Sequence, residues 1–176
     1  GFSNLLQHYS NLTKSFNVPV IVAVNKFPQD TPEEISEVSQ LLSLNKIPFE
    51  YSNGYAEGGA GTTNLANHCI NLIETSATAP KYLYDLSESI PCKIDRIASE
   101  IYHAKEIDYS EEASRQLEIV DRYYKDYPVC IAKTQYSFTD DPKKLGAPTE
   151  HTLHVDKLLI RSGAKFIVAV CGGMML

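Results

Sequence analysis

The sequence predicts an α/β protein with a layered fold, in which a mostly parallel sheet is flanked by helices. Two apolar runs rich in β-branched residues, at 18–27 (VPVIVAVNKF) and 128–132 (PVCIA), are typical of strands buried on both faces. The stretches between them repeat apolar residues every three or four positions, which is typical of amphipathic helices. Strands that alternate with helices favour a layered α/β domain.

Composition and charge exclude several classes of protein. The chain has 176 residues, of which 43% are hydrophobic and 22% charged, as expected for one globular domain with a real core. The net charge is −6 and no basic block occurs, so nucleic-acid binding through Lys and Arg is not expected. No apolar run approaches the roughly 18 residues of a membrane-spanning helix, and we expect no membrane partner.

The cysteines indicate a reducing compartment. Cys69, Cys92, Cys130 and Cys171 are widely spaced and form no CxxC pair. We therefore expect free thiols, as in the cytoplasm, and neither a disulfide framework nor a zinc site.

The two ends of the chain suggest a piece of a longer protein. Leu5, Tyr9, Leu12 and Phe16 share one face of a helix that the chain enters without an initiator Met. We expect residues 1–16 to lead in from a preceding, absent nucleotide domain. Residues 17–176 would then form one α/β domain that is cut short at its end.

A capping box predicts the start of the next helix. Thr31 suits the N-cap, Pro32 the first turn, and Glu34 completes the box. The helix would bury Ile35 and Leu42, and a short strand is expected at 48–51.

The later elements follow from the same patterns. Apolar spacing predicts helices around 65–72, 90–101 and 110–124, the last beginning at Ser110 as N-cap. Residues 152–160 and 165–171 are predicted strands separated by Ser162 and Gly163.

Ligands of open parallel sheets bind beyond the carboxyl ends of the strands. That rule selects the segment from Asn25 to Pro28 and the Gly-rich loop 51–61, which contains Tyr55. Glycines let a backbone approach a ligand, and successive amides can hold anions. From the residues alone, Phe27 and Tyr55 are either packing residues or a pair that stacks on a flat ring.

Two nucleotide-binding motifs are absent. The segment GGAGTT (58–63) has hydroxyl groups but lacks the Lys of a phosphate-binding P-loop. The segment NKFP has Pro28 where the guanine-reading NKxD motif of GTPases has Asp. A GTPase is therefore excluded, and this chain has no evident means of activating a γ-phosphate.

The segment 133–154 offers weaker candidates. Lys133 directly follows a predicted strand and is expected to point into a cleft. Asp140 and Asp141 suit a turn and helix cap, or a poor cation site. His151 and His154 would lie on opposite faces of a strand, so we expect no metal ligands in this chain.

Long segments of the sequence resemble formate–tetrahydrofolate ligase, in the family's order and across essentially the whole chain. The matching pieces are GFSNLLQHYSN, VPVIVAVNKFPQDT, YAEGGAGTTNLA, YDL with IPCKIDRIASEIYHA, VCIAKTQYSFTDDPKKLGAPT and GAKFIVAV. The resemblance implies the Rossmann-like C-terminal domain of a P-loop-type ligase.

The resemblance also implies a reaction and its cofactors. The family joins formate to tetrahydrofolate with ATP, giving 10-formyltetrahydrofolate, ADP and phosphate through formyl phosphate. ATP with Mg²⁺ and a monovalent cation serve the parent enzyme, which forms homotetramers. Its P-loop and basic residues would lie in an N-terminal region, so we expect no catalytic residue here, no tightly bound cofactor and no activity of this chain alone.

In the family, two aromatic residues of this region sandwich a planar ring of the substrate or nucleotide. They correspond to Phe27 and Tyr55, and the family often has Trp at the second position, whereas this chain has no Trp. The proline-containing tail that usually follows the last strand is also missing. The candidate binding residues are Asn25, Phe27, Pro28, Tyr51, Tyr55, Gly58 and Gly59.

A domain taken from a larger enzyme exposes the surface that packed on its neighbour. We therefore predict that the chain self-associates through Leu5, Leu12 and Phe16.

Overall fold

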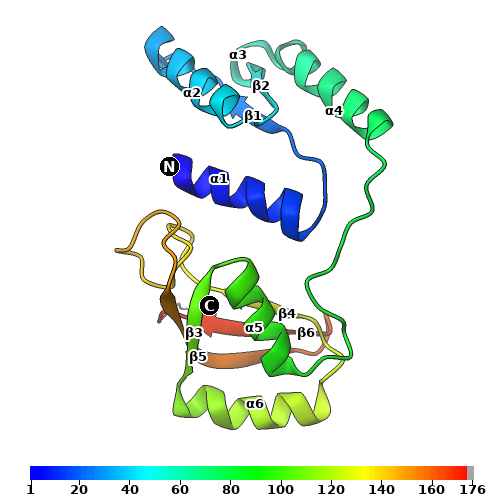
Figure 1. Cartoon of the computed structure of the whole chain (residues 1–176), viewed down its shortest axis with the longest axis vertical. Coiled ribbons are helices and arrows are strands. Elements are labelled where there is room, and N and C mark those ends of the chain that lie inside the picture. The colour runs from blue at the N-terminus through cyan, green and yellow to red at the C-terminus, as the bar shows by residue number, and fades with distance from the viewer. Residues whose placement is uncertain (174–176) are drawn as a thin grey trace. The chain divides into compact units, whose positions relative to one another are not determined.

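The computed structural model describes residues 1–173, which divide into two compact units (Figure 1). The larger unit contains residues 1–16 and the chain from Pro80 onward, and the smaller unit contains residues 17–79. The predicted α/β class is confirmed, because helices flank mostly parallel sheets. The division differs from the expected lead-in helix at 1–16 followed by one domain at 17–176.

The smaller unit is built on a two-stranded parallel sheet. Val22 of one strand lies opposite Phe49 of the other, and Asn25 lies opposite Ser52. The helices and strands are β1 (Val22–Asn25), α2 (Pro32–Leu44), β2 (Phe49–Ser52), α3 (Gly54–Glu57), a 3₁₀ turn (Ala60–Thr62) and α4 (Thr63–Thr75).

The two helices α2 and α4 are fastened to opposite faces of β2. The Tyr51 hydroxyl donates to the backbone carbonyl of Ile35 in α2 at 2.7 Å. The neighbouring Glu50 points the other way, and its carboxylate lies 3.1 Å from His68 of α4. The predicted capping box is confirmed at the start of α2, where Thr31 and Glu34 satisfy each other's backbone amides.

The first strand is shorter and less buried than predicted. The expected strand at 18–27 is limited to Val22–Asn25, and its residues alternate between half-buried and exposed. The expectation of burial on both faces is therefore wrong for this chain. The physical reason is that β1 has few neighbours to cover it. Among the described residues it pairs only with β2, and the side-chain contacts that hold α2 and α4 are made by β2.

The larger unit contains a four-stranded sheet in the order β3-β5-β6-β4. Of its three pairings, β3 with β5 and β4 with β6 are parallel, whereas β5 and β6 form an antiparallel hairpin. The elements are α1 (Phe2–Ser10) with a π-helical turn (Asn11–Ser15), α5 (Ile90–Glu100), β3 (Ala104–Tyr109), α6 (Glu111–Tyr123), β4 (Val129–Ala132), β5 (His151–Arg161) and β6 (Phe166–Cys171).

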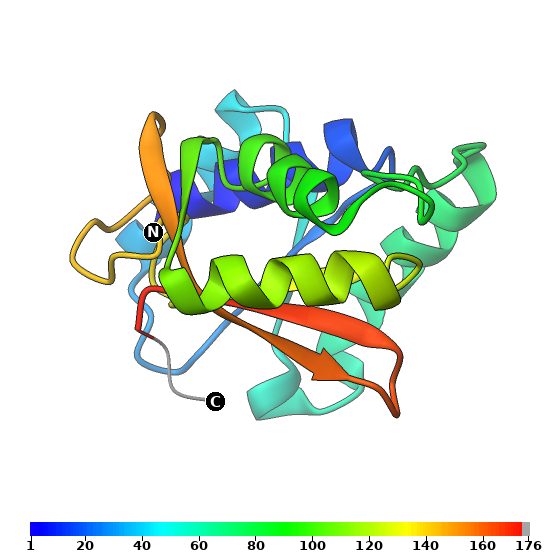
Figure 2. The same cartoon turned by 90° about the horizontal axis from the view of Figure 1, so that it is seen from below.

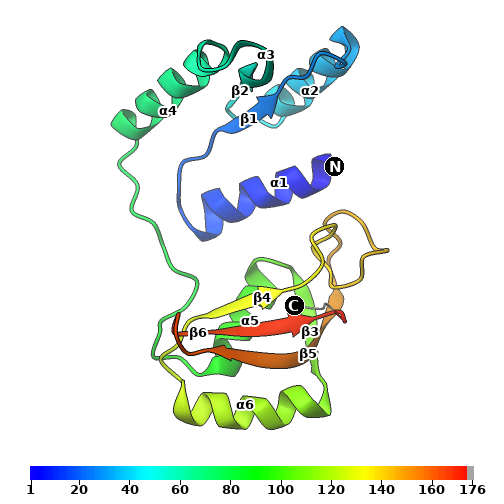
Figure 3. The same ribbon diagram turned by 180° about the vertical axis from the view of Figure 1, so that it is seen from behind.

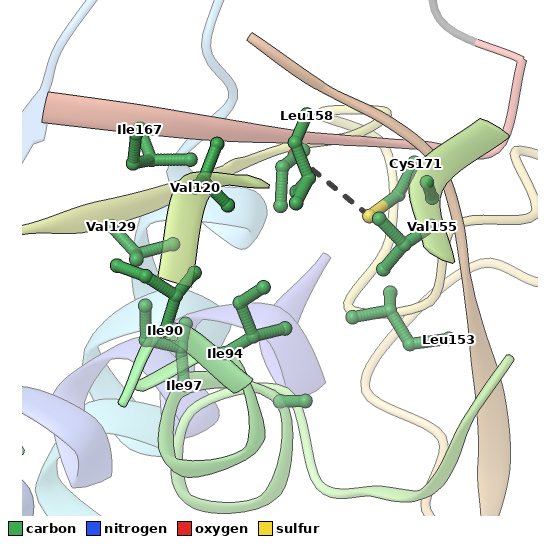
Figure 4. Close-up of a cluster of buried hydrophobic side chains, with 13 residues drawn as sticks. Ile90, Ile94, Ile97, Val120, Val129, Leu153, Val155, Leu158, Ile167 and Cys171 are labelled. Atoms are coloured by element: carbon green, nitrogen blue, oxygen red, sulfur yellow. Dashed lines mark hydrogen bonds between the residues drawn. The ribbon is translucent and has the colours of Figure 1, made fainter. Parts of the chain in front are cut away.

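One apolar cluster joins α5, α6 and the sheet. Ile90, Ile94 and Ile97 of α5 point toward Val129, Leu153, Val155 and Ile167 of the strands (Figure 4). Both helices cover the same face of the sheet (Figure 2), and Figure 3 shows the strands in front of α5.

Burial raises the pKa of the Cys171 thiol to about 12, so this cysteine is a neutral core residue.

The first helix is attached to the corner between α5 and β3. The buried Asn11 donates its side-chain amide to the carbonyl of Ile101 at 3.0 Å, and Gln7 contacts the ring of His103. Helix α1 is therefore part of the larger unit.

Within residues 1–173, no helix has the length and apolar character needed to cross a membrane.

Candidate functional site

The predicted site residues all lie in the smaller unit, around the edge where β1 and β2 end. The amide of Lys26 donates to the carbonyl of Ser52 at 2.9 Å, which continues the sheet by one step beyond Asn25. The loops that carry Phe27 and Tyr55 therefore leave the same edge of the sheet, at the carboxyl ends of its two parallel strands.

Phe27 stands on a tight turn directly after β1. Its amide donates to the Asp30 carboxylate at 2.7 Å, and the amide of Asp30 donates back to the Phe27 carbonyl at 3.1 Å. Pro28 occupies the second position of this turn, where its fixed φ is favoured. The turn runs straight into Thr31, the N-cap of α2.

Tyr55 lies on the one-turn helix α3, whose base is closed by hydrogen bonds. The Asn53 side chain donates to the Glu57 carboxylate at 2.7 Å, and the amide of Glu57 donates to the Asn53 carbonyl at 3.0 Å. The amide of Asn53 donates to the carbonyl of Gly61 at 3.0 Å, so the loop begins and ends at the same place.

The structure brings the two predicted aromatic rings together. Their centroids are 5.7 Å apart and their planes are tilted by 54°. Both side chains are exposed, Phe27 to 43% and Tyr55 to 74%. A planar ligand between parallel rings needs a separation of roughly 7 Å, twice a van der Waals contact. The pair must therefore open slightly to admit such a ligand, which the exposure of Tyr55 permits.

Tyr51 serves the scaffold of this site. Its hydroxyl contacts the Ser39 hydroxyl at 3.0 Å and the Ile35 carbonyl, both in α2. Its ring meets Phe49 edge-on. Asn25 is exposed at the end of β1.

The three glycines of the loop differ in whether the backbone requires a glycine at that position. Gly58 has φ 57° and ψ −138°, a conformation that is essentially restricted to glycine. Gly59 has ordinary helical angles and open space around it. Gly61 has no room for a side chain, because a Cβ there would collide with the backbone carbonyl of Asn53.

This difference predicts unequal effects of two alanine substitutions. Gly61→Ala should lower the free energy of unfolding of the smaller unit by about 1–3 kcal/mol, since the loop closure must shift. Gly59→Ala is the matched control and should change it by less than about 0.5 kcal/mol. Urea unfolding followed through amide resonances of the smaller unit measures both, and equal effects would contradict the steric account.

The Gly-rich loop does not fit a phosphate group. The hydroxyls of Thr62 and Thr63 both donate to the carbonyl of Gly59. The amides of Gly58 and Gly61 donate to carbonyls inside the loop, at 3.0 and 3.2 Å. These donors are already used within the loop, and GGAGTT contains no Lys. Little therefore remains to neutralise the charge of a phosphate group.

Lys133, in the larger unit, was expected to point into a cleft, and it lines a cavity together with His8 and Phe138. Its ammonium group donates to the carbonyls of Thr134, Ser137 and Thr139 and lies 4.7 Å from the Tyr102 ring centroid. Burial lowers the pKa of Lys133, and nearby Asp140 opposes that shift. This lysine pins the loop that follows β4.

Asp140 and His154 of the same region are partners in the structure. Asp140 is 6% exposed, and its carboxylate accepts from the backbone and the ring of His154 at 2.9 and 2.8 Å. His151 is buried whereas His154 is exposed, as predicted for opposite faces of a strand. Asp140 therefore anchors the loop to β5, whereas the Asp141 carboxylate accepts the amide of Lys143 within the loop.

The sequence interpretation missed Asp30. It lies three residues after an aromatic residue that is followed by Pro28, and an acid at that spacing can close a turn. That local pattern could have identified it, although side-chain acceptors in turns are common.

Comparisons with known proteins agree with one another. A family model described as formate–tetrahydrofolate ligase matches residues 1–176. The formate–tetrahydrofolate ligase of Lactobacillus delbrueckii subsp. bulgaricus is 42% identical over 176 residues, which are 99% of this chain and 31% of that protein.

Two further relatives carry the same name. The Limosilactobacillus reuteri protein is 40% identical and the Parabacteroides distasonis protein 41% identical, each over 177 aligned residues covering 99% of this chain and 32% of the relative. The chain thus spans about a third of the length of the curated relatives it matches.

Proposed function

Because the chain belongs to the formate–tetrahydrofolate ligase family, we propose that it supplies one wall of that enzyme's substrate cleft. The observation that carries this proposal is the exposed pair of Phe27 and Tyr55 beyond the carboxyl ends of two parallel strands. Two aromatic faces at such an edge suit a flat heterocycle, either the pterin of tetrahydrofolate or the adenine of ATP.

The reaction proposed for the parent enzyme joins formate to tetrahydrofolate. ATP supplies the driving force, and the products are 10-formyltetrahydrofolate, ADP and phosphate. Such chemistry depends on positioning and on neutralising charge around the transferred phosphoryl group. The donors of loop 58–63 are unsuited to that task, which supports placing phosphate, Mg²⁺ and a monovalent cation in other parts of the parent.

This chain alone is therefore a ring-binding module without the chemistry. Incubated with ATP, formate and tetrahydrofolate, it should form no ADP above the rate without protein. Single-turnover analysis of radiolabelled ATP measures this, and stoichiometric ADP formation by the purified chain would refute the proposed division of labour. We also propose that the parent enzyme assembles as a homotetramer. This chain alone should self-associate through Leu5, Leu12 and Phe16.

Binding tests the proposed function directly. Isothermal titration with tetrahydrofolate, and separately with ATP, should give weak saturable binding for at least one of them, because only one wall of the cleft is present. The absence of binding by both ligands at millimolar concentration would sink the proposal.

A further inference from the structure

The carboxylate of Asp30 holds the backbone segment from which the Phe27 ring projects. It accepts the Phe27 amide at 2.7 Å, while the Asp30 amide donates to the Phe27 carbonyl at 3.1 Å. From these two bonds we infer that Asp30 is a positioning residue, which fixes Phe27 for stacking on a flat heteroaromatic ring. This inference rests on the proposed function of the Phe27–Tyr55 pair.

The ring of Phe27 has little else to hold it. It is 43% exposed, and the ring that it meets in the described structure is that of Tyr55, which is itself 74% exposed. Side-chain rotamers depend on backbone angles, so a closed turn restricts where the ring can point. A ring that is already in place loses less conformational freedom when a ligand binds.

The hydrogen bond of Asp30 is not needed to begin α2. Thr31 and Glu34 already satisfy each other's amides in the capping box. Asp30 lies one residue before that cap, where its negative charge also interacts favourably with the helix dipole. The two roles can be separated, because an amide side chain keeps the hydrogen-bond acceptor and removes the charge.

The experiment compares Asp30→Ala with Asp30→Asn in the 176-residue chain. Asp85→Ala is the matched control, because Asp85 likewise accepts a backbone amide, that of Ser87 at 2.8 Å, in an exposed turn of the larger unit. Two readouts are used: the NMR contact between the Phe27 and Tyr55 rings without ligand, and the affinity for tetrahydrofolate.

We expect Asp30→Ala to lose the inter-ring contact and to bind tetrahydrofolate about fivefold to tenfold more weakly, the effect of one charge-assisted hydrogen bond in a half-exposed turn. Asp30→Asn should restore both readouts to within about twofold, since its carbonyl oxygen can accept the Phe27 amide. Asp85→Ala should change neither. In a Phe27→Ala background, Asp30→Ala should have no further effect on affinity.

Two results would overturn the inference. An Asp30→Ala protein that keeps the inter-ring contact shows that the turn does not need the carboxylate. An Asp30→Asn protein that behaves like Asp30→Ala shows that the charge matters and not the acceptor. If the unaltered chain fails to bind tetrahydrofolate, the proposed function fails, while the inter-ring contact still decides the role of Asp30.

Discussion

Replacing Lys93 by methionine is expected to lower the free energy of unfolding of the larger unit by about 2–4 kcal/mol. Lys93 is fully buried in α5, and its ammonium group donates to the carbonyls of Leu86, Lys125 and Tyr127 at 2.5–3.0 Å. Burial lowers the pKa of this lysine, and the carboxylates of Asp126, Asp121 and Glu88 oppose that shift. Methionine fills the space but leaves three carbonyls without a donor.

Urea unfolding followed through amide resonances of α5 measures this effect. Lys105→Met is the control, because Lys105 is 61% exposed and pairs with Glu150 at the surface at 3.5 Å. The control should change the free energy of unfolding by no more than about 0.5 kcal/mol. Equal values for both variants would show that the three carbonyls find other partners at no cost.

Removing both rings of the aromatic pair should abolish detectable binding of tetrahydrofolate. An aromatic side chain stacked on a base contributes about 1–3 kcal/mol by alanine substitution. Phe27→Ala and Tyr55→Ala should therefore each weaken binding about tenfold. Because both rings are exposed, neither change should destabilise the fold by more than about 0.5 kcal/mol.

Titration calorimetry of the two single variants and the double variant measures this loss. Tyr82→Ala is the matched control, because Tyr82 is a 91% exposed tyrosine of the larger unit. It should bind like the unaltered chain. An unchanged affinity in the double variant would place the ligand elsewhere.

Local chemistry made several elements predictable from the sequence. Thr31, Pro32 and Glu34 form a capping box whose hydrogen bonds are purely local, and α2 begins where they predict. Ser110 caps α6 in the same way, accepting the amide of Ala113 at 3.0 Å. The apolar spacing of Ile90, Ile94 and Ile97 placed α5 and its buried face.

Other features depend on contacts distant in the sequence. The strand β3 (Ala104–Tyr109) was missed, because its sequence AKEIDY is polar and it is held by pairing with β5. The antiparallel direction of β5 and β6 is a property of their pairing. The division into units at residues 17 and 79 likewise follows from contacts between segments that are distant in the sequence.

The candidate site was predictable in part. The rule on strand ends and the resemblance selected Phe27 and Tyr55, and the structure places their rings 5.7 Å apart. The sequence could not assign Tyr51 to anchoring α2, because that depends on where its hydroxyl points. The carbonyl partners of Lys133 were not predictable for the same reason, because they come from the folding of the loop that follows it.

The central claim is that Phe27 and Tyr55 together form the ring-binding wall of a formate–tetrahydrofolate ligase. Intermolecular NMR contacts between bound ligand and the two aromatic rings test it most directly. We predict contacts from the heterocycle of tetrahydrofolate or ATP to the ring protons of both residues, lost in Phe27→Ala and kept in Tyr82→Ala. If the protein is saturated with ligand and the bound ligand contacts neither ring, the claim is wrong.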